Sequence, residues 1–314
     1  MLHRQVELAL FASSHVEGFP PRERAALFAL SAAHLAIDTS AEFSALAQSA
    51  LVPAWAHSLG QPHQQLTGHH EPVKTVAVGR LGNREVIVSG SGDNTVRIWD
   101  EAGHPVGEPL TGHTGPVEAV AVGRLGGRDV IVSGSWDNTV RIWDEAGQPV
   151  GKPLTGHHRY VAAVAVGRWS KREVIVSGSG DNTVRIWDEA GHPVGEPLTG
   201  HYGSVAAVAV GRLGGRDVIV SGSGDNTVRI WDEAGHPVGE PLTGHTGPVM
   251  AVAVGRLGGQ DVIVSGSEDA TVRIWGENEA MQIDFLEPVC AVAITRDGLI
   301  VGSGRALVSI ISAC

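Results

Sequence analysis

One stretch, VIVSGSGDNTVRIWDEAGHPVGEPLTGH, constrains this chain more than any other feature, because it stands unchanged at residues 86–113, 174–201 and 218–245. A copy at 130–157 differs only at Trp136, Gln148 and Lys152, and a further copy keeps the pattern from Val262 to Trp275. The Gly-His pairs and the tryptophans of these copies both recur every 44 residues. A fixed period of this length predicts a repeat architecture in which each unit packs against its neighbours.

Each unit divides into four short extended segments. In the second unit, Val117–Val122 and Val130–Ser135 are rich in apolar and β-branched residues, and an Asp-Asn turn leads to Thr139–Trp143. The fourth segment, Pro149–Leu154, holds two prolines, which only an edge strand tolerates. Four-stranded antiparallel units repeated radially describe an all-β propeller.

The residues that recur also resemble those of the WD40 repeat: Gly-His, a Ser-Gly-Ser strand, an Asp six residues before a Trp, and Trp-Asp. In that family a His, a Ser or Thr, the turn Asp and the Trp form a buried hydrogen-bonded set within each blade. The resemblance places these sets at His69, Asp93 and Trp99; His113, Asp137 and Trp143; His157, Asp181 and Trp187; His201, Asp225 and Trp231; and His245, Asp269 and Trp275. Ser89 and Ser91 lie on the same strand face, so either completes the first set.

These His, Ser and Asp sets do not indicate an enzyme. Five copies of one active site are implausible, and each set serves the packing of its own blade. Adjacent histidines such as His69 and His70 point to opposite sides of an extended chain, which disfavours a shared metal ion. The glycine-rich stretches contain no phosphate-binding loop motif. We therefore expect no catalytic residues, no metal and no cofactor.

Residues 1–60 differ from the rest of the chain in composition, because they contain no repeat and are rich in alanine and leucine. Helical spacing near the start, Pro20-Pro21, and the capping-box spacing of Thr39 to Glu42 predict three short helices. Such helices are marginal alone. The segment is interpreted either as a cap or linker on the propeller, which occupies residues 61–314, or as the stub of a longer helical signalling region.

The number of blades follows from counting strands. Five sets of inner strands precede a sixth, degenerate set that begins at Pro288. In this set Phe285, Arg305 and Ile311 replace the His, Asp and Trp of the other repeats. No outer strand follows this set, whereas residues 61–66 precede the first Gly-His pair. WD40 rings usually close by sharing one blade between the termini. The resemblance therefore implies six blades closed by the N-terminal outer strand; the alternatives are a fragment of a longer ring and a chain that swaps or dimerises to close.

Charge and cysteine content restrict the partners and the compartment. The net charge is −11, of which residues 61–314 carry −9, with 20 Lys and Arg against 29 Asp and Glu. An acidic surface disfavours nucleic acid or an anionic membrane as the main partner. Two cysteines form no disulfide framework, and we find no signal-peptide layout. We expect a cytoplasmic monomer.

Two functions from different classes fit these observations. The first is a non-catalytic scaffold that presents a propeller face to a protein or peptide partner. The alternative is the sensor module of a bacterial signalling NTPase or kinase system, because the Gly-Arg-Leu-Gly-Gly-Arg-Asp hairpins and the helical lead-in resemble repeats of such proteins. No NTPase motif is present in the chain itself.

Differences between copies predict where a partner binds. In WD40 proteins, partners often contact the mouth of the ring through the residue before the Asp and the positions around the first Val. Trp136 stands before the Asp where three other copies have Gly, and Tyr160 opens the next unit. Aromatic clusters are common energetic anchors of interfaces. We expect a binding patch on the face that carries the Gly-His loops, consisting of Trp136, Tyr160 and Glu118, with Lys74, Met250 and Glu268 elsewhere around the mouth.

Overall fold

The computed structural model describes residues 66–276, 280–295, 298–304 and 306–311. Every regular element within these ranges is a β-strand, which confirms the all-β prediction for this part of the chain. The predicted helical segment, residues 1–60, lies outside the described residues. Across the described ranges, no helix is both long and apolar enough to cross a membrane.

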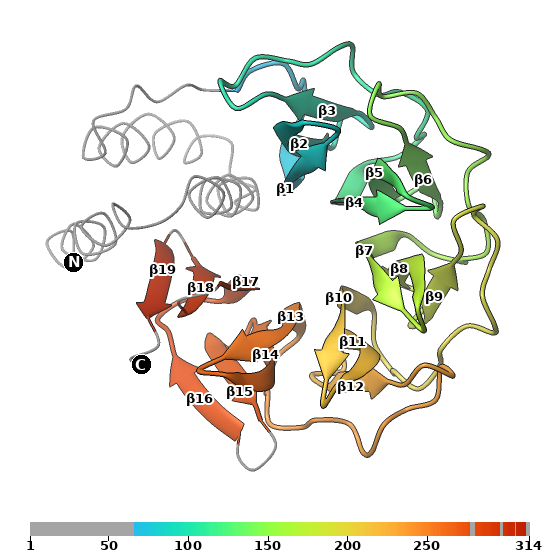
Figure 1. The fold of residues 1–314 in the computed structure, drawn as a ribbon. Helices are drawn as coiled ribbons and strands as arrows, with labels where there is room; N and C mark the ends of the chain where they lie inside the picture. The colour runs from blue at the N-terminus through green and yellow to red at the C-terminus, as the bar shows by residue number, and fades with distance from the viewer. Residues whose placement is uncertain (1–65, 277–279, 296–297, 305, 312–314) are drawn as a thin grey trace, which may run out of the picture.

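The strands form six antiparallel sheets, which are numbered here in chain order (Figure 1). Sheet 1 contains β1 (Val73–Leu81), β2 (Arg84–Ser91) and β3 (Val96–Trp99); sheet 2, β4 (Val117–Leu125), β5 (Arg128–Ser135) and β6 (Val140–Trp143); sheet 3, β7 (Val161–Trp169), β8 (Arg172–Ser179) and β9 (Val184–Trp187). Sheet 4 contains β10 (Val205–Leu213), β11 (Arg216–Ser223) and β12 (Val228–Trp231); sheet 5, β13 (Val249–Leu257), β14 (Gln260–Ser267), β15 (Thr271–Trp275) and β16 (Ala280–Asp284); sheet 6, β17 (Val289–Ile294), β18 (Gly298–Ser303) and β19 (Ala306–Ile311).

The middle strand of sheets 2 to 5 is covered on both faces, which explains its unbroken run of β-branched residues. In β5, Ile131 and Val132 are neighbours and therefore point to opposite faces, yet both are fully buried. One face contacts the preceding sheet and the other contacts the following sheet. The turn to β6 places Asn138 at φ 67°, a left-handed conformation that asparagine tolerates better than most residues.

The fourth segment of sheets 1 to 4 pairs only at its two ends. In sheet 2, isolated bridges join Val140 to Leu154 and Trp143 to Pro149, and no continuous strand forms between them. Prolines 149 and 153 lack the N–H groups that a ladder needs. The edge position predicted for this segment is confirmed, but its description as a full strand is wrong for these sheets. Sheet 5, whose fourth segment lacks proline, has the full strand β16.

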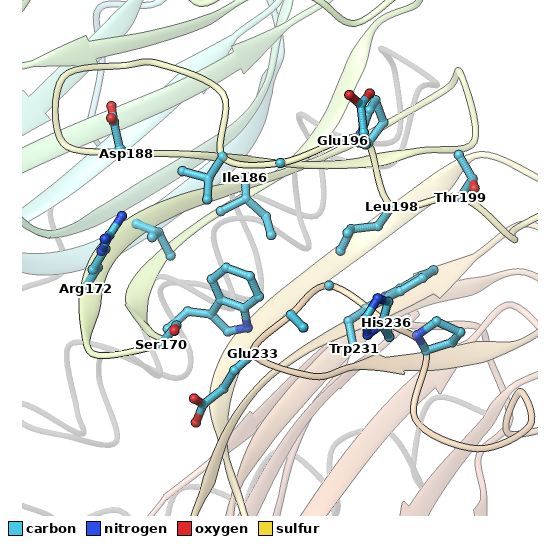
Figure 2. A pocket seen from close by; sticks show the side chains of 18 residues that line it. Ser170, Arg172, Ile186, Asp188, Glu196, Leu198, Thr199, Trp231, Glu233 and His236 are labelled. Carbon is cyan, nitrogen blue, oxygen red and sulfur yellow. The ribbon is translucent and has the colours of Figure 1, made fainter.

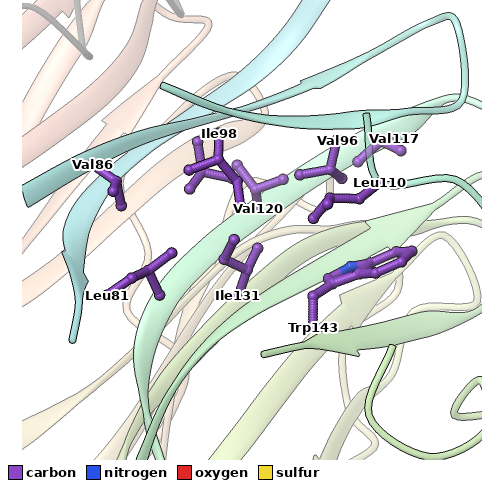
Figure 3. Close-up of a cluster of buried hydrophobic side chains, with 10 residues drawn as sticks. Leu81, Val86, Val96, Ile98, Leu110, Val117, Val120, Ile131 and Trp143 are labelled. Atoms are coloured by element: carbon purple, nitrogen blue, oxygen red, sulfur yellow. The ribbon is translucent and has the colours of Figure 1, made fainter. Parts of the chain in front are cut away.

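Neighbouring sheets pack through their long first strands. β1 lies on β4, β4 on β7, β7 on β10, β10 on β13 and β13 on β17. A glycine makes this approach possible, because a Cβ atom added to Gly79 would lie 2.5 Å from the Cβ of Val122. Figure 3 shows the resulting core between sheets 1 and 2, in which Val96, Ile98 and Leu110 of the first sheet meet Ile131 and Trp143 of the second.

The six sheets lie along an arc, with sheet 1 and sheet 6 at its two ends (Figure 1). Val73 at the start of β1 is half-buried, whereas its counterparts Val117, Val161, Val205 and Val249 are 0 % exposed. The leading face of sheet 1 therefore lacks the full cover that a preceding sheet gives the others. Residues 61–65 of the predicted closing strand lie outside the described residues, so closure of the ring remains a prediction.

Candidate functional site

The histidine of each repeat is held in a chain of buried hydrogen bonds. In sheet 2, Nδ1 of His113 lies 2.8 Å from Oδ2 of Asp137, and its Nε2 lies 2.8 Å from Oγ of Ser133. The indole Nε1–H of Trp143 donates to the same Oγ at 2.9 Å. This arrangement fits a neutral imidazole that donates from Nδ1 to the carboxylate and accepts the serine proton at Nε2.

The same geometry occurs in all of the first five sheets. The His-to-Asp distances range from 2.8 to 3.0 Å, each His-to-Ser distance is 2.8 Å, and each Trp-to-Ser distance is 2.9 Å. The five sets are His69, Ser89, Asp93 and Trp99; His113, Ser133, Asp137 and Trp143; His157, Ser177, Asp181 and Trp187; His201, Ser221, Asp225 and Trp231; and His245, Ser265, Asp269 and Trp275.

The structure decides between the two serines of each strand. Ser89 bridges the histidine and the tryptophan of the first set. Ser91, two residues later, instead donates to the carbonyl oxygen of Glu71 and accepts from the backbone N–H of Asp93. The first serine thus completes the side-chain set, and the second stabilises the loop that carries the Gly-His pair.

A threonine that sequence reasoning missed belongs to each set. Oγ1 of Thr95 donates to Oδ1 of Asp93 at 2.6 Å and lies 3.3 Å from Nδ1 of His69. The backbone N–H groups of Thr95 and His70 also donate to this carboxylate. The recurring Asp-Asn-Thr sequence could have predicted this threonine, because an Asp followed two residues later by Thr is a common turn motif in which side chains bond to the backbone.

Burial and hydrogen bonding set the charges of these groups. Burial alone would raise the pKa of Asp93, but the hydrogen bonds from Thr95, the His70 N–H and His69 outweigh it and lower the pKa to about 2. Burial lowers the pKa of His69, and the Asp93 hydrogen bond only partly opposes this shift. The carboxylate is therefore ionised and the imidazole neutral near pH 7.

These sets hold the fold and cannot reach a substrate. The bridging serine of sheet 2, Ser133, is 0 % exposed, and Trp143 is 1 % exposed. A nucleophile needs a route to the atom that it attacks, and this oxygen has none. No group of three or more His, Cys, Asp or Glu side chains in the described residues is placed to hold a metal ion.

The sixth sheet replaces the polar set with apolar packing. Phe285 stands where the histidine is expected and packs against a core that includes Val289 and Leu299. Its backbone N–H donates to the carbonyl oxygen of Ala270 at 2.8 Å. The other two replacements, Arg305 and the side chain of Ile311, lie outside the described residues.

The two aromatic residues singled out from the sequence lie together on one face. The rings of Trp136 and Tyr160 are stacked, with centroids 5.4 Å apart and an interplanar angle of 27°. Trp136 is 55 % exposed. A hydroxyl contact of 3.3 Å joins Oη of Tyr160 to Oγ of Ser204, so the tyrosine reaches from sheet 3 to sheet 4.

Three of the four remaining residues of the predicted patch stand at the same position of their sheets, a β-bulge near the start of the first strand. Lys74, Glu118 and Met250 each follow the first Val of β1, β4 and β13, where the strand register shifts by one residue. Such a bulge leaves its extra residue unpaired and redirects the side chain. All three side chains are half-buried, and Glu268 is exposed. The described contacts join Trp136 to Tyr160 but do not join these four residues to that pair.

The sequence matches the model of a known protein family over most of its length. The family model for WD40, described as WD domain, G-beta repeat, matches residues 60–100, 103–144, 147–188, 191–232 and 235–276. The chain belongs to the WD40-repeat family. The matches cover the five hydrogen-bonded sets and end before β16 of sheet 5 and before sheet 6. WD40 repeats generally serve as protein-interaction scaffolds and are typically non-catalytic. No match was found among curated proteins.

Proposed function

We propose that this WD40 protein is a non-catalytic scaffold that binds a protein or peptide partner on the face carrying the Gly-His loops. The Trp136 patch, defined as Trp136 and Tyr160, is the centre of the contact. Glu118 flanks it, and Lys74, Met250 and Glu268 contribute elsewhere around the mouth. The protein acts as a cytoplasmic monomer without a cofactor, and its partner is neither nucleic acid nor a membrane, in keeping with its acidic composition.

One observation carries this proposal: an exposed Trp stacks on a Tyr at a turn that needs neither residue. The equivalent turns hold Gly92, Gly180 and Gly224, and they form the same backbone bond to the preceding loop. For example, Gly92 N–H donates to the carbonyl oxygen of Pro72 at 2.9 Å, as Trp136 N–H does to that of Pro116. The indole is therefore free for recognition.

The stacked pair is also held in a fixed position. A Cβ atom added to Gly180 would lie 2.5 Å from the Tyr160 ring, so the ring rests directly on the turn of its own sheet. The contact with Ser204 fixes the hydroxyl end of the ring. Rigid aromatic side chains lose little conformational entropy on binding, which suits them as anchors.

Replacing Trp136 by glycine tests the proposal. Trp136→Gly restores the residue of sheets 1, 3 and 4, so we expect the unfolding free energy to stay within about 0.5 kcal/mol of wild type. Binding should weaken by about 2 kcal/mol or more, roughly 30-fold. The measurement is quantitative capture of cell proteins on immobilised full-length wild type and variant, followed by titration of any protein lost from the variant.

Trp136→Phe is the matched control, because it keeps an aromatic ring beside Tyr160. The proposal expects this variant to retain most of the captured partner. Equal capture by wild type and Trp136→Gly would show that the partner binds elsewhere.

A further inference from the structure

The loops that follow the buried histidines differ between sheets, although the strands on either side of them are nearly identical. Sheets 2 and 5 carry Thr-Gly-Pro at residues 114–116 and 246–248. Sheet 3 carries His-Arg-Tyr at residues 158–160, and sheet 4 carries Tyr-Gly-Ser at residues 202–204. Together with Trp136, the loops of sheets 3 and 4 therefore concentrate the differences between copies at the end that carries the Gly-His loops.

Side-chain contacts join these differences into one surface. Tyr160 stacks on Trp136 of sheet 2, and its hydroxyl oxygen lies 3.3 Å from Oγ of Ser204 in sheet 4. Ser204 stands where sheets 2 and 5 have proline, so this contact needs a change in both loops. Two residues before it, Tyr202 is 89 % exposed. Accessible aromatic side chains thus follow one another over sheets 2, 3 and 4.

The other group of differences in sheet 3 lies at the opposite end and fills the core. Between β7 and β8 the chain reads Trp169-Ser170-Lys171, where sheets 2, 4 and 5 read Leu-Gly-Gly. Trp169 is 6 % exposed and belongs to the core between sheets 3 and 4, which includes Leu198 and Trp231 (Figure 2). A buried indole offers no surface to a partner.

The two residues after Trp169 keep the backbone of the glycines that they replace. Ser170 has φ 50° and Lys171 has φ 65°, in the left-handed region that L-residues with a Cβ rarely adopt. Gly126 and Gly127 occupy the same positions in sheet 2 at φ 58° and 76°. This turn is therefore strained, but the accessible aromatic side chains of sheets 2 to 4 all lie at the Gly-His end.

The Gly-His end carries positive charge on sheets 3 and 4. Arg159 is exposed and makes no ion pair within the part of the chain that the structure describes. A Cβ atom added to Gly156 would lie 3.0 Å from a guanidinium nitrogen of Arg185, and one added to Gly200 would lie 3.1 Å from that of Arg229. Both guanidinium groups thus lie against the starts of the same two loops.

The carboxylates at this end are either bonded already or lie on other sheets. Asp181 and Asp225 each accept hydrogen bonds from the histidine and from the backbone of their own sets. Glu118 on sheet 2 is half-buried. The exposed carboxylates belong to sheets 1, 5 and 6: Glu71, Glu268 and Glu287. A negatively charged group of a partner is therefore attracted to sheets 3 and 4 and repelled by the loops of the other sheets.

We propose that the partner presents an acidic segment with a flat apolar side chain to the loops of sheets 3 and 4. This inference rests on the proposed scaffold function and adds Arg159 and Tyr202 to its binding surface. The flat side chain packs on the stacked rings of Trp136 and Tyr160 and on Tyr202. A carboxylate of the partner pairs with the Arg159 guanidinium, whose planar donors match a carboxylate with two parallel hydrogen bonds.

A peptide library tests the chemistry of the partner without knowledge of its identity. Random peptides displayed on phage are selected on the immobilised full-length protein, and each selected peptide is then tested on the Trp136→Gly variant. We expect peptides that lose binding on this variant. We expect these peptides to be enriched in Asp and Glu relative to the starting library and to carry an aromatic residue or proline.

The other repeats supply matched variants for titration of the tightest acidic peptide by calorimetry. Arg159→Gly restores the glycine of sheets 2, 4 and 5, and Tyr202→Thr restores the threonine of sheets 2 and 5. Each should weaken the peptide by about tenfold or more. Arg172→Gln restores the residue of sheet 5 at the hairpin end and removes the same charge, so it should leave the affinity unchanged.

The outcomes separate this inference from the scaffold function on which it rests. A selection without any peptide that depends on Trp136 overturns the acidic partner, whereas the scaffold function fails only if captured cell proteins are also indifferent to Trp136. Peptides that depend on Trp136 but lack the excess of Asp and Glu, or that bind either loop variant as tightly as wild type, overturn the acidic partner and leave the scaffold function standing.

Discussion

The buried imidazole of His201 is neutral because burial disfavours a charged ring and its two nitrogens face different partners. Nδ1 of His201 faces the Asp225 carboxylate and Nε2 faces the Ser221 hydroxyl. A second proton on the ring would break the bond from the serine and place a charge at a side chain that is 1 % exposed. Burial accordingly lowers the pKa values of His201 and His245 although a carboxylate lies beside each ring.

Lowered pKa values make the stability of this protein depend on pH in one direction. The pKa values of His69, His201 and His245 in the folded state lie below the reference of 6.5, and the pKa of Asp269 falls from 3.8 to about 2. The unfolded chain therefore binds protons first as the pH falls. The unfolding free energy should be highest above about pH 7, decline from about pH 6.5 as unfolded histidines protonate, and decline again below about pH 4.

Urea unfolding followed by tryptophan fluorescence, repeated across this pH range at constant ionic strength, measures the dependence. A midpoint that rises as the pH falls from 7 to 5 would contradict the assignment of neutral, desolvated histidines.

The residues of the buried sets could be predicted only in part. The resemblance supplied His69, Asp93 and Trp99, because each stands at a fixed position in the repeat. The choice between Ser89 and Ser91 could not be made, since alternate residues of a strand point to the same face and only distance separates them. Thr95 was missed because its role arises from the turn geometry of Asp93.

The hairpins show how far a repeat pattern predicts individual elements. The inner strands followed from β-branched runs between glycine-rich turns, as in β4 and β5. The outer segments did not follow as fully, because Pro149 and Pro153 allow bridges at the ends but no continuous ladder. The strain at Ser170 and Lys171 could not be seen either, since a sequence does not show whether a turn without glycine has changed its backbone.

Restoring glycine at this turn should stabilise the protein. Each of Ser170 and Lys171 stores about 1–3 kcal/mol of strain, and the added freedom of the unfolded chain offsets about 0.4–1 kcal/mol per glycine. We expect Ser170→Gly with Lys171→Gly to raise the unfolding free energy by about 1 kcal/mol or more, measured by urea unfolding.

The reciprocal change in sheet 4 is the control. Gly214→Ser with Gly215→Lys introduces the same residues at φ 55° and 77°, where an added Cβ meets no atom within 4 Å. Only strain changes there, so this variant should lose a similar free energy. Equal unfolding midpoints for wild type and both double variants would show that the turn relaxes freely.

At the scale of the whole molecule, the repeats form an arc in which every inner sheet covers the next. Sheet 1 has no described sheet before it, and sheet 6 has three strands without an outer segment among the described residues. Near-identical sheets would accept one another as neighbours almost equally well, so an uncovered end favours wrong pairing and association between copies. What completes the two ends therefore determines whether the protein stays monomeric.

The N-terminal outer strand that we predict, residues 61–66, would complete sheet 6 by pairing with β19. Deleting residues 1–67 should then expose the edge beside β19 (Ala306–Ile311), and an unpaired strand edge drives aggregation. Deleting only residues 1–57 removes most of the predicted helical segment, residues 1–60, but keeps the strand, so this shorter deletion should remain monomeric. Size-exclusion chromatography with light scattering and thermal melting distinguish the two variants. The closure model fails if the longer deletion stays monomeric with an unchanged melting temperature. If both deletions aggregate alike, residues 1–57 rather than residues 61–66 protect the open ends of the arc.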